Sequence, residues 1–192
     1  QPLTLRGVNW FGFETSDHVV HGLWARNWKD MIAQIKAVGF NAVRIPVCPG
    51  TLAGSRVSSV NTTLNPDLAG RTSLEVLDRV LGEFDRQGLH ILLDHHRLDC
   101  NGGISELWYD PGHGEQDWID DLVFMARRYR NLPHFLGIDL KNEPHGTATW
   151  GLGRPATDWN SAAERAARAV LEAAPDILIF VEGIQDNPSC SG

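Results

Sequence analysis

Residues 89–96 read Leu-His-Ile-Leu-Leu-Asp-His-His, an apolar run that ends in three polar side chains. Short β-rich runs of this kind recur along the chain and alternate with longer stretches of helical period. This alternation is typical of repeated βα units around a parallel sheet. The predicted strands are residues 5–10, 41–47, 89–94, 135–140 and 177–182.

Four amphipathic helices are predicted between these strands. Asn27 is a candidate N-cap for the first, Thr72 and Glu75 have capping-box spacing before the second, and Gly88 is expected to end the second. Each helix is predicted to have one apolar face. In chain order, the four faces consist of Trp28, Met31, Ile32, Ile35 and Val38; Leu74, Leu77, Val80, Leu81 and Phe84; Trp118, Leu122, Met125 and Tyr129; and Ala162, Ala163, Ala166, Val170 and Leu171.

Polar residues stand where each predicted strand stops. They are Asn9, Arg44, Asp94-His95-His96, Asn142-Glu143 and Glu182. Active sites lie at the carboxyl ends of the strands in (β/α)8 barrels, and ligands also bind there in doubly wound sheets. The first predicted βα loop lacks a G-x-G-x-x-G pattern, so a (β/α)8 barrel is favoured. A complete barrel takes about 250 residues and eight strands, whereas these 192 residues supply about five βα units.

Charge, apolar runs and histidine spacing indicate which kinds of partner the protein is not expected to bind. The chain has 17 Lys and Arg against 24 Asp and Glu, a net charge of -7, which disfavours binding to nucleic acid. Its apolar runs are far shorter than the roughly 20 residues of a membrane-spanning helix. The histidines lack H-E-x-x-H or other metal spacing, so no metal and no cofactor are expected.

The chain has three cysteines, Cys48, Cys100 and Cys190. Their spacing does not fit a structural zinc site. Ordinary thiols and a single disulfide both remain open. Because three is an odd number, at least one thiol stays unpaired within the chain.

Asn142-Glu143-Pro144 is the sharpest local signal for chemistry. Proline restricts the residue before it and ends strand pairing, which would place the Glu143 carboxylate at a strand terminus. Neighbouring side chains of a strand point to opposite faces, so Asn142 and Glu143 can share a cleft only if the strand loosens or bulges. The alternative is structural, with Glu143 simply paired with Arg44 or Lys141.

Five segments together resemble the glycoside hydrolase family 5 enzymes, cellulase-type endoglucanases of clan A. Residues 5–14 (LRGVNWFGFE) and 21–24 (HGLW) look like the opening of that family, and residues 41–46 (NAVRIP) resemble its second strand. Residues 94–96 (DHH) match its D-x-H, and residues 142–144 match its fourth-strand N-E-P. The order and spacing of these motifs make the resemblance specific over nearly the whole chain.

The resemblance implies the roles of four residues. Glu143 would be the general acid/base, Asn142 would contact the sugar 2-hydroxyl, and Arg44 and His96 would support the catalytic carboxylates. His95 falls at the variable place of D-x-H. The implied activity is that of a secreted, retaining endo-β-1,4-glucanase acting on β-glucan. A β-mannanase or another β-glycanase is the alternative, because specificity lies in loops and in further strands.

The family carries its nucleophilic glutamate on the seventh strand, beyond the five strands of this sequence. Residues 1–192 are therefore expected to be the N-terminal portion of a single catalytic barrel, completed by the rest of the protein or by a second chain or copy. Glu182 is a weaker candidate for a substitute nucleophile. An inactive glycan-binding fragment is a third possibility.

Seven tryptophans are many for this length. Trp24, Trp108 and Trp150 fall in predicted loops and are candidate platforms for sugar rings, with ordinary packing as the alternative. Trp28, Trp118 and Trp159 fall on helical positions and are predicted to lie in the core.

Overall fold

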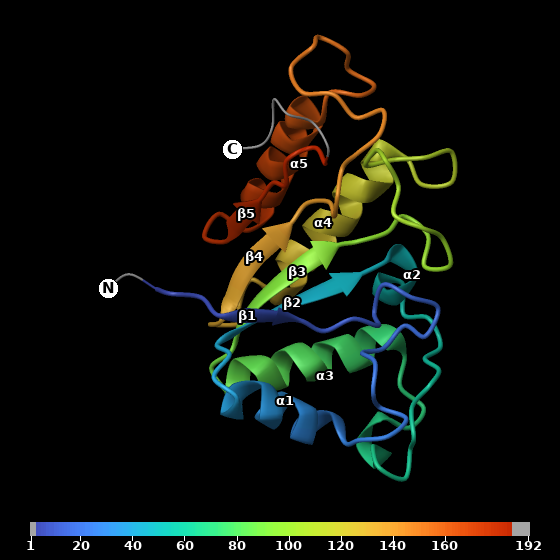
Figure 1. Ribbon diagram of the computed structural model, residues 1–192, viewed down its shortest axis with the longest axis vertical. Coiled ribbons are helices and arrows are strands. Elements are labelled where there is room, and N and C mark those ends of the chain that lie inside the picture. Colours follow the sequence, from blue (N-terminus) through green and yellow to red (C-terminus); the bar gives the residue numbers. More distant parts are fainter. Residues whose placement is uncertain (1–2, 186–192) are drawn as a thin grey trace.

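The computed structural model describes residues 3–185, which form a five-stranded parallel sheet with the order β1-β2-β3-β4-β5 (Figure 1). The strands are β1 (Gly7–Asn9), β2 (Ala42–Val47), β3 (His90–His95), β4 (Phe135–Asp139) and β5 (Leu178–Phe180). The helices are α1 (Trp28–Ala37), α2 (Pro49–Leu52), α3 (Ser73–Arg86), α4 (Glu115–Tyr129) and α5 (Trp159–Ala173), with a 3-10 turn at Pro66–Leu68. The predicted α/β class and the five predicted parallel strands are confirmed.

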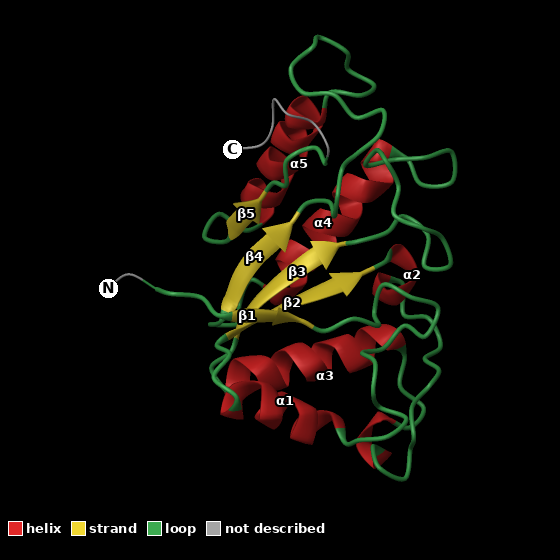
Figure 2. Ribbon diagram, in the orientation of Figure 1, coloured by secondary structure: helices red, strands yellow, loops and turns green. Residues whose placement is uncertain are grey.

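The helices pack in two pairs alongside the sheet. Helices α1 and α3 lie together next to β1 and β2, and α4 packs against α5 near β4 and β5 (Figure 2). The strands lie in the sheet in the same order as in the chain, and each is parallel to its neighbours. All five carboxyl ends therefore lie at one edge of the sheet.

Local sequence signals set the helix ends. The Asn27 side chain caps α1 by accepting from two backbone nitrogens. The capping box of Thr72 and Glu75 opens α3, and Gly88 follows its end with a φ of 74°. These three predictions are confirmed.

Two residues of the predicted apolar faces lie outside the core. Val38 is the C-cap of α1 and is 64% exposed, and it lines an open groove together with Val8 of β1. Leu171 is exposed because its neighbour Val170 takes the inward position, and successive residues of a helix are turned by about 100°. The predicted place of Leu171 on the apolar face is therefore wrong.

The outer strands are shorter than predicted. Strand β1 spans three residues instead of 5–10, and β5 spans three instead of 177–182. Within residues 3–185, each of them pairs on one side only, so fewer backbone hydrogen bonds extend it.

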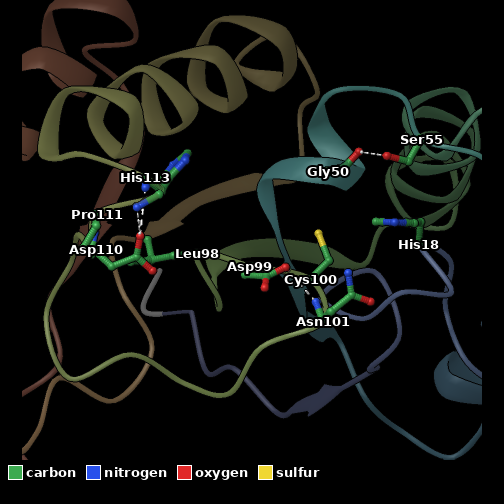
Figure 3. A pocket seen from close by; sticks show the side chains of 11 residues that line it. His18, Gly50, Ser55, Leu98, Asp99, Cys100, Asn101, Asp110, Pro111 and His113 are labelled. Atoms are coloured by element: carbon green, nitrogen blue, oxygen red, sulfur yellow. Dashed lines mark hydrogen bonds between the residues drawn. The ribbon is translucent and has the colours of Figure 1, made fainter.

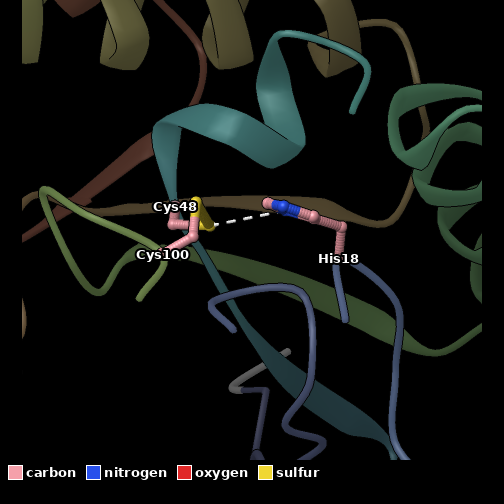
Figure 4. A group of neighbouring side chains, drawn as sticks. All are labelled: His18, Cys48 and Cys100. Carbon is pink, nitrogen blue, oxygen red and sulfur yellow. Dashed lines mark hydrogen bonds between the residues drawn. A yellow bond between two sulfur atoms is a disulfide. The ribbon is translucent and has the colours of Figure 1, made fainter. Parts of the chain in front are cut away.

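One disulfide joins Cys48, at the start of α2, to Cys100, in the loop after β3 (Figure 4). This settles the alternative that the sequence left open for these two cysteines. Cys190 lies outside the described residues. In the same described part, no helix is both long and apolar enough to cross a membrane.

Candidate active site

Arg44 connects the carboxyl ends of the strands. Its guanidinium lies 2.8 Å from Asp139 Oδ2, 3.0 Å from Asp94 Oδ2 and 3.0 Å from Glu182 Oε1. It also donates to Asn142 Oδ1 at 3.1 Å and to Asn9 Oδ1 at 3.3 Å. Parallel pairing brings these residues together from across the sheet, since Asn9 is level with Arg44 and Asp94 is level with Asp139.

Negative charge exceeds positive charge around this guanidinium. Burial raises the pKa of Asp94, and Arg44 only partly opposes the effect. Burial also raises the pKa of Asp139, helped by the charge of Asp94. For Arg44, burial disfavours the charge, but Asp94 and Asp139 outweigh it and raise the pKa. A single cation shared by three carboxylates leaves the cluster able to hold an extra proton.

His96 is fixed by Asp94. Its Nδ1 lies 2.5 Å from Asp94 Oδ2, and its ring meets the exposed ring of Phe11 edge to face. Burial lowers the pKa of His96 to about 4, although the Glu14 carboxylate acts in the opposite direction. The imidazole is therefore neutral over the range in which most enzymes work.

The backbone leaves the strand before Asn142 and Glu143. Strand β4 ends at Asp139, and Glu143 has a φ of 48°. An L-residue in this left-handed region costs about 1–2 kcal/mol, and such strain collects at functional sites. The strand departs from regular geometry here, as expected. The departure takes the form of a left-handed backbone at Glu143, whereas a residue before proline usually has an extended backbone.

Glu182 holds Glu143 in this conformation. Its Oε2 accepts the backbone N–H of Glu143 at 2.8 Å, while its Oε1 pairs with Arg44. Within the described residues the Glu143 carboxylate itself has no ion pair, so neither Arg44 nor Lys141 is its partner. The half-buried Glu143 side chain is thus available to a ligand.

Asn142 and Lys141 complete the loop. Asn142 Nδ2 is buried and has no hydrogen-bond partner in the described part of the chain. The Lys141 ammonium donates to the carbonyls of Ser105 and Asn142, at 2.7 and 2.8 Å. Burial lowers the pKa of Lys141 to about 8. A buried donor without a partner is unusual, so the free Nδ2 of Asn142 points to a ligand atom that would accept its hydrogen bond.

The three candidate tryptophan platforms divide into two groups. Trp24 is 53% exposed and Trp150 is 42% exposed, so both present a face that a sugar ring could meet. Trp108 is fully buried, donates to Glu115 Oε2 and packs against Trp118 and Trp159. The prediction for Trp108 is wrong, because its loop packs this side chain against the tryptophans of α4 and α5 and leaves no face exposed. The core prediction for the three helical tryptophans is confirmed.

A cavity of about 620 Å³ lies beside α2 and the loop after β3 (Figure 3). None of the predicted catalytic residues lines it, so the charge cluster around Arg44, and not this cavity, marks the candidate active site. The lining residues are His18, Gly50, Ser55, Leu98, Asp99, Cys100, Asn101, Asp110, Pro111, Gly112 and His113.

Sequence reasoning missed Asp139 and considered Lys141 only as a possible ion-pair partner of Glu143. Both are charged yet almost fully buried, at and just after the end of an otherwise apolar strand. Charged residues are seldom buried without a specific partner, so their position within the run 135–141 could have drawn attention to them.

The family model described as Cellulase (glycosyl hydrolase family 5) matches residues 3–191. The chain belongs to glycoside hydrolase family 5. Its motifs were therefore correctly recognised, and the fold is part of the barrel of that family.

Individual family 5 relatives agree with this. The chain is 60% identical to the major extracellular endoglucanase of Xanthomonas campestris pv. campestris over 188 residues, 97% of this chain and 39% of the relative. The solved catalytic domain of the major endoglucanase from that organism superposes with a TM-score of 0.96 at 58% identity, covering 100% of this chain and 56% of the domain.

A complex of the endocellulase of Pyrococcus horikoshii with cellotetraose gives a TM-score of 0.93 at 45% identity, over 96% of this chain and 52% of that one. The family 5 chain described here thus spans only about 40–55% of the length of these relatives.

Proposed function

We propose that the protein is a retaining endo-β-1,4-glucanase in which Glu143 is the general acid/base. The observation that carries this proposal is the geometry of the loop after β4. Glu143 has a strained backbone fixed by Glu182 and a carboxylate without an ion pair in the described residues, and the unpartnered amide of Asn142 precedes it.

The neighbouring groups suit glycoside hydrolysis. The free Nδ2 of Asn142 can donate to a sugar hydroxyl, which fits the role that the family resemblance gives it. Arg44 and the neutral His96 surround the buried carboxylates and support the site without competing for the Glu143 proton. Trp24 and Trp150 offer exposed faces for sugar stacking.

A retaining mechanism needs a second carboxylate about 5–5.5 Å from the first. Glu182 suits this role poorly, because both of its oxygens already accept hydrogen bonds, from Arg44 and from the Glu143 backbone. We therefore propose that the nucleophile lies outside this chain. Residues 1–192 would form the N-terminal portion of one catalytic barrel, completed by the rest of the polypeptide or by another chain or copy.

The substrate class and location are proposed by analogy. The Pyrococcus relative is described in complex with cellotetraose, and the Xanthomonas relative is described as extracellular. We propose a β-1,4-glucan substrate and an extracellular location for this protein. Nucleic acid and membranes are not proposed as partners.

The test is Glu143→Gln in the complete polypeptide that carries this chain. General acid catalysis contributes about 10²–10⁴-fold, so release of reducing ends from carboxymethyl-cellulose should fall by that factor. A dinitrophenyl cellobioside needs no proton at its leaving group, and its first step should be affected much less.

Glu172→Gln, an exposed glutamate of α5, is the matched control and should keep full activity. A loss in the first step on the dinitrophenyl substrate as large as the loss on carboxymethyl-cellulose would contradict the acid role of Glu143. Faster hydrolysis of β-mannan than of β-glucan would contradict the proposed specificity. Binding to cellulose without hydrolysis by the wild-type protein would indicate a glycan-binding module.

A further inference from the structure

A cluster of two histidines and one aspartate lies on the opposite face of β3 from Arg44. His95, the last residue of β3, and His113, just before α4, both direct Nε2 at Asp121 Oδ2, each at 2.9 Å. The three atoms lie within 4.8 Å of one another. Asp94 and His95 are consecutive in the strand, so this cluster is separate from the charge cluster around Arg44.

We propose that His95, His113 and Asp121 bind one divalent transition-metal ion of the zinc type. Zinc accepts imidazole nitrogen and carboxylate oxygen at about 2.0–2.2 Å, which places tetrahedral ligands about 3.3 Å apart. The two nitrogen-to-oxygen separations, 2.9 Å each, are a few tenths of an ångström shorter, so small side-chain movements would admit the ion. Two histidines and one carboxylate leave the fourth position for water.

Charge favours a cation at this place. Within the part of the chain that the structure describes, Asp121 forms no ion pair with lysine or arginine, and its polar partners are the two imidazoles. A metal ion bound through Nε2 needs the lone pair of that nitrogen, so each imidazole would carry a proton on Nδ1 in the metal-bound form.

The ligands are held by rigid elements. His95 belongs to a paired strand and is almost fully buried, and Asp121 lies in the second turn of α4. The Asp110 carboxylate accepts the backbone N–H groups of Gly112 and His113, which fixes the turn that carries the His113 imidazole. Such preorganisation reduces the entropic cost of binding.

One of the three proposed ligands lines a cavity. His113 also lines the 620 Å³ cavity shown in Figure 3, next to Asp110. The bound ion would clamp the end of β3 to α4. Its effect is therefore on stability, and the proposed hydrolysis does not require it.

A second group, His18 with Cys48 and Cys100, does not compete as a metal site. Its two sulfurs are joined to each other, whereas a metal needs thiolates (Figure 4). The cluster of His95, His113 and Asp121 keeps its three ligand atoms.

The test is calorimetric titration of Zn²⁺ into the complete polypeptide, purified without a histidine tag and stripped with a chelator. The wild type should bind one more equivalent than either His113→Ala or Asp121→Asn. Zn²⁺ should also raise the melting temperature of the wild type more than that of the variants. Substitution of Co²⁺ should give the visible absorption of a tetrahedral site.

His134→Ala is the matched control, because His134 contacts one aspartate, Asp85, and should keep the wild-type stoichiometry. Circular dichroism verifies that each variant folds, and the conservative Asp121→Asn retains the shape of the side chain. Equal stoichiometry in the wild type and in both ligand variants would overturn the proposal. No Zn²⁺ binding by the wild type would overturn it as well, and the trio would then be only hydrogen-bonded.

Discussion

The carboxylate of Glu182 accepts the backbone N–H of Glu143 at 2.8 Å. Through its other oxygen it also pairs with Arg44, so one side chain fixes the main chain of Glu143 and the guanidinium at the centre of the strand ends. Glu182 is thus a positioning residue for the proposed acid/base.

We expect Glu182→Gln to lower kcat by roughly 10-fold or more with little change in KM. The amide keeps the shape of the side chain but has only one acceptor oxygen, so either Arg44 or the Glu143 N–H loses its partner. Steady-state kinetics on a soluble cello-oligosaccharide measures this, with Glu172→Gln as control. Unchanged kcat would contradict the positioning role, and a rise in KM alone would indicate substrate binding instead.

The low pKa of His96 predicts a pH dependence of stability. The unfolded chain binds a proton near pH 6.5, whereas the folded protein does so near pH 4. Between these values acidification favours unfolding, so the contribution is complete above about pH 6.5 and is lost as the pH falls toward 4. The full effect is at most about 3 kcal/mol.

Urea denaturation of the wild type and of His96→Asn, from pH 4 to 7, measures this contribution. The other histidines contribute equally to both proteins and cancel in the difference. The gap between the two proteins should narrow as the pH falls. A gap that stays constant over the range would contradict a lowered pKa.

The tryptophans should separate stability from binding. Trp108→Ala removes a fully buried ring and should lower the free energy of unfolding by about 3–5 kcal/mol. Trp24→Ala and Trp150→Ala change exposed side chains, so stability should change by less than about 0.5 kcal/mol. We expect both exposed variants to raise KM for β-glucan several-fold, because a stacking face is lost. Normal KM in both would remove them from the proposed binding surface.

The Cys48–Cys100 disulfide should stabilise the fold, because it closes a loop with a sequence separation of 52. Loop-closure entropy for this length corresponds to about 4 kcal/mol at most. We expect the double variant Cys48→Ala, Cys100→Ala to lose about 2–4 kcal/mol of unfolding free energy. Dithiothreitol should destabilise the wild type and leave the double variant unchanged; equal sensitivity of the two proteins would show that this bridge contributes nothing.

The sequence predicted the order of elements well because local physics determines it. Helical periodicity located α1, α3, α4 and α5, and caps such as Asn27 and Gly88 marked their ends. The predicted outer strands were too long, since the extent of β1 and β5 depends on neighbours that are remote in sequence.

The candidate site was recognised only in part. Asn142 and Glu143 could be found from a local motif, but the left-handed backbone of Glu143 depends on Glu182, which is 39 residues away. The sharing of Arg44 among several carboxylates also depends on tertiary pairing, as does the burial of Trp108. Spacing along a chain does not encode such contacts.

The agreement between strand order and chain order has a consequence for synthesis on the ribosome. Each new strand finds its neighbour already made, so the sheet can grow from β1 toward β5 as the chain emerges. Arg44 meets its partner Glu182 only after 138 more residues have been added. The nascent protein can therefore form most of its sheet early, and Glu182, which orients Glu143, is made only after the last of the five described strands.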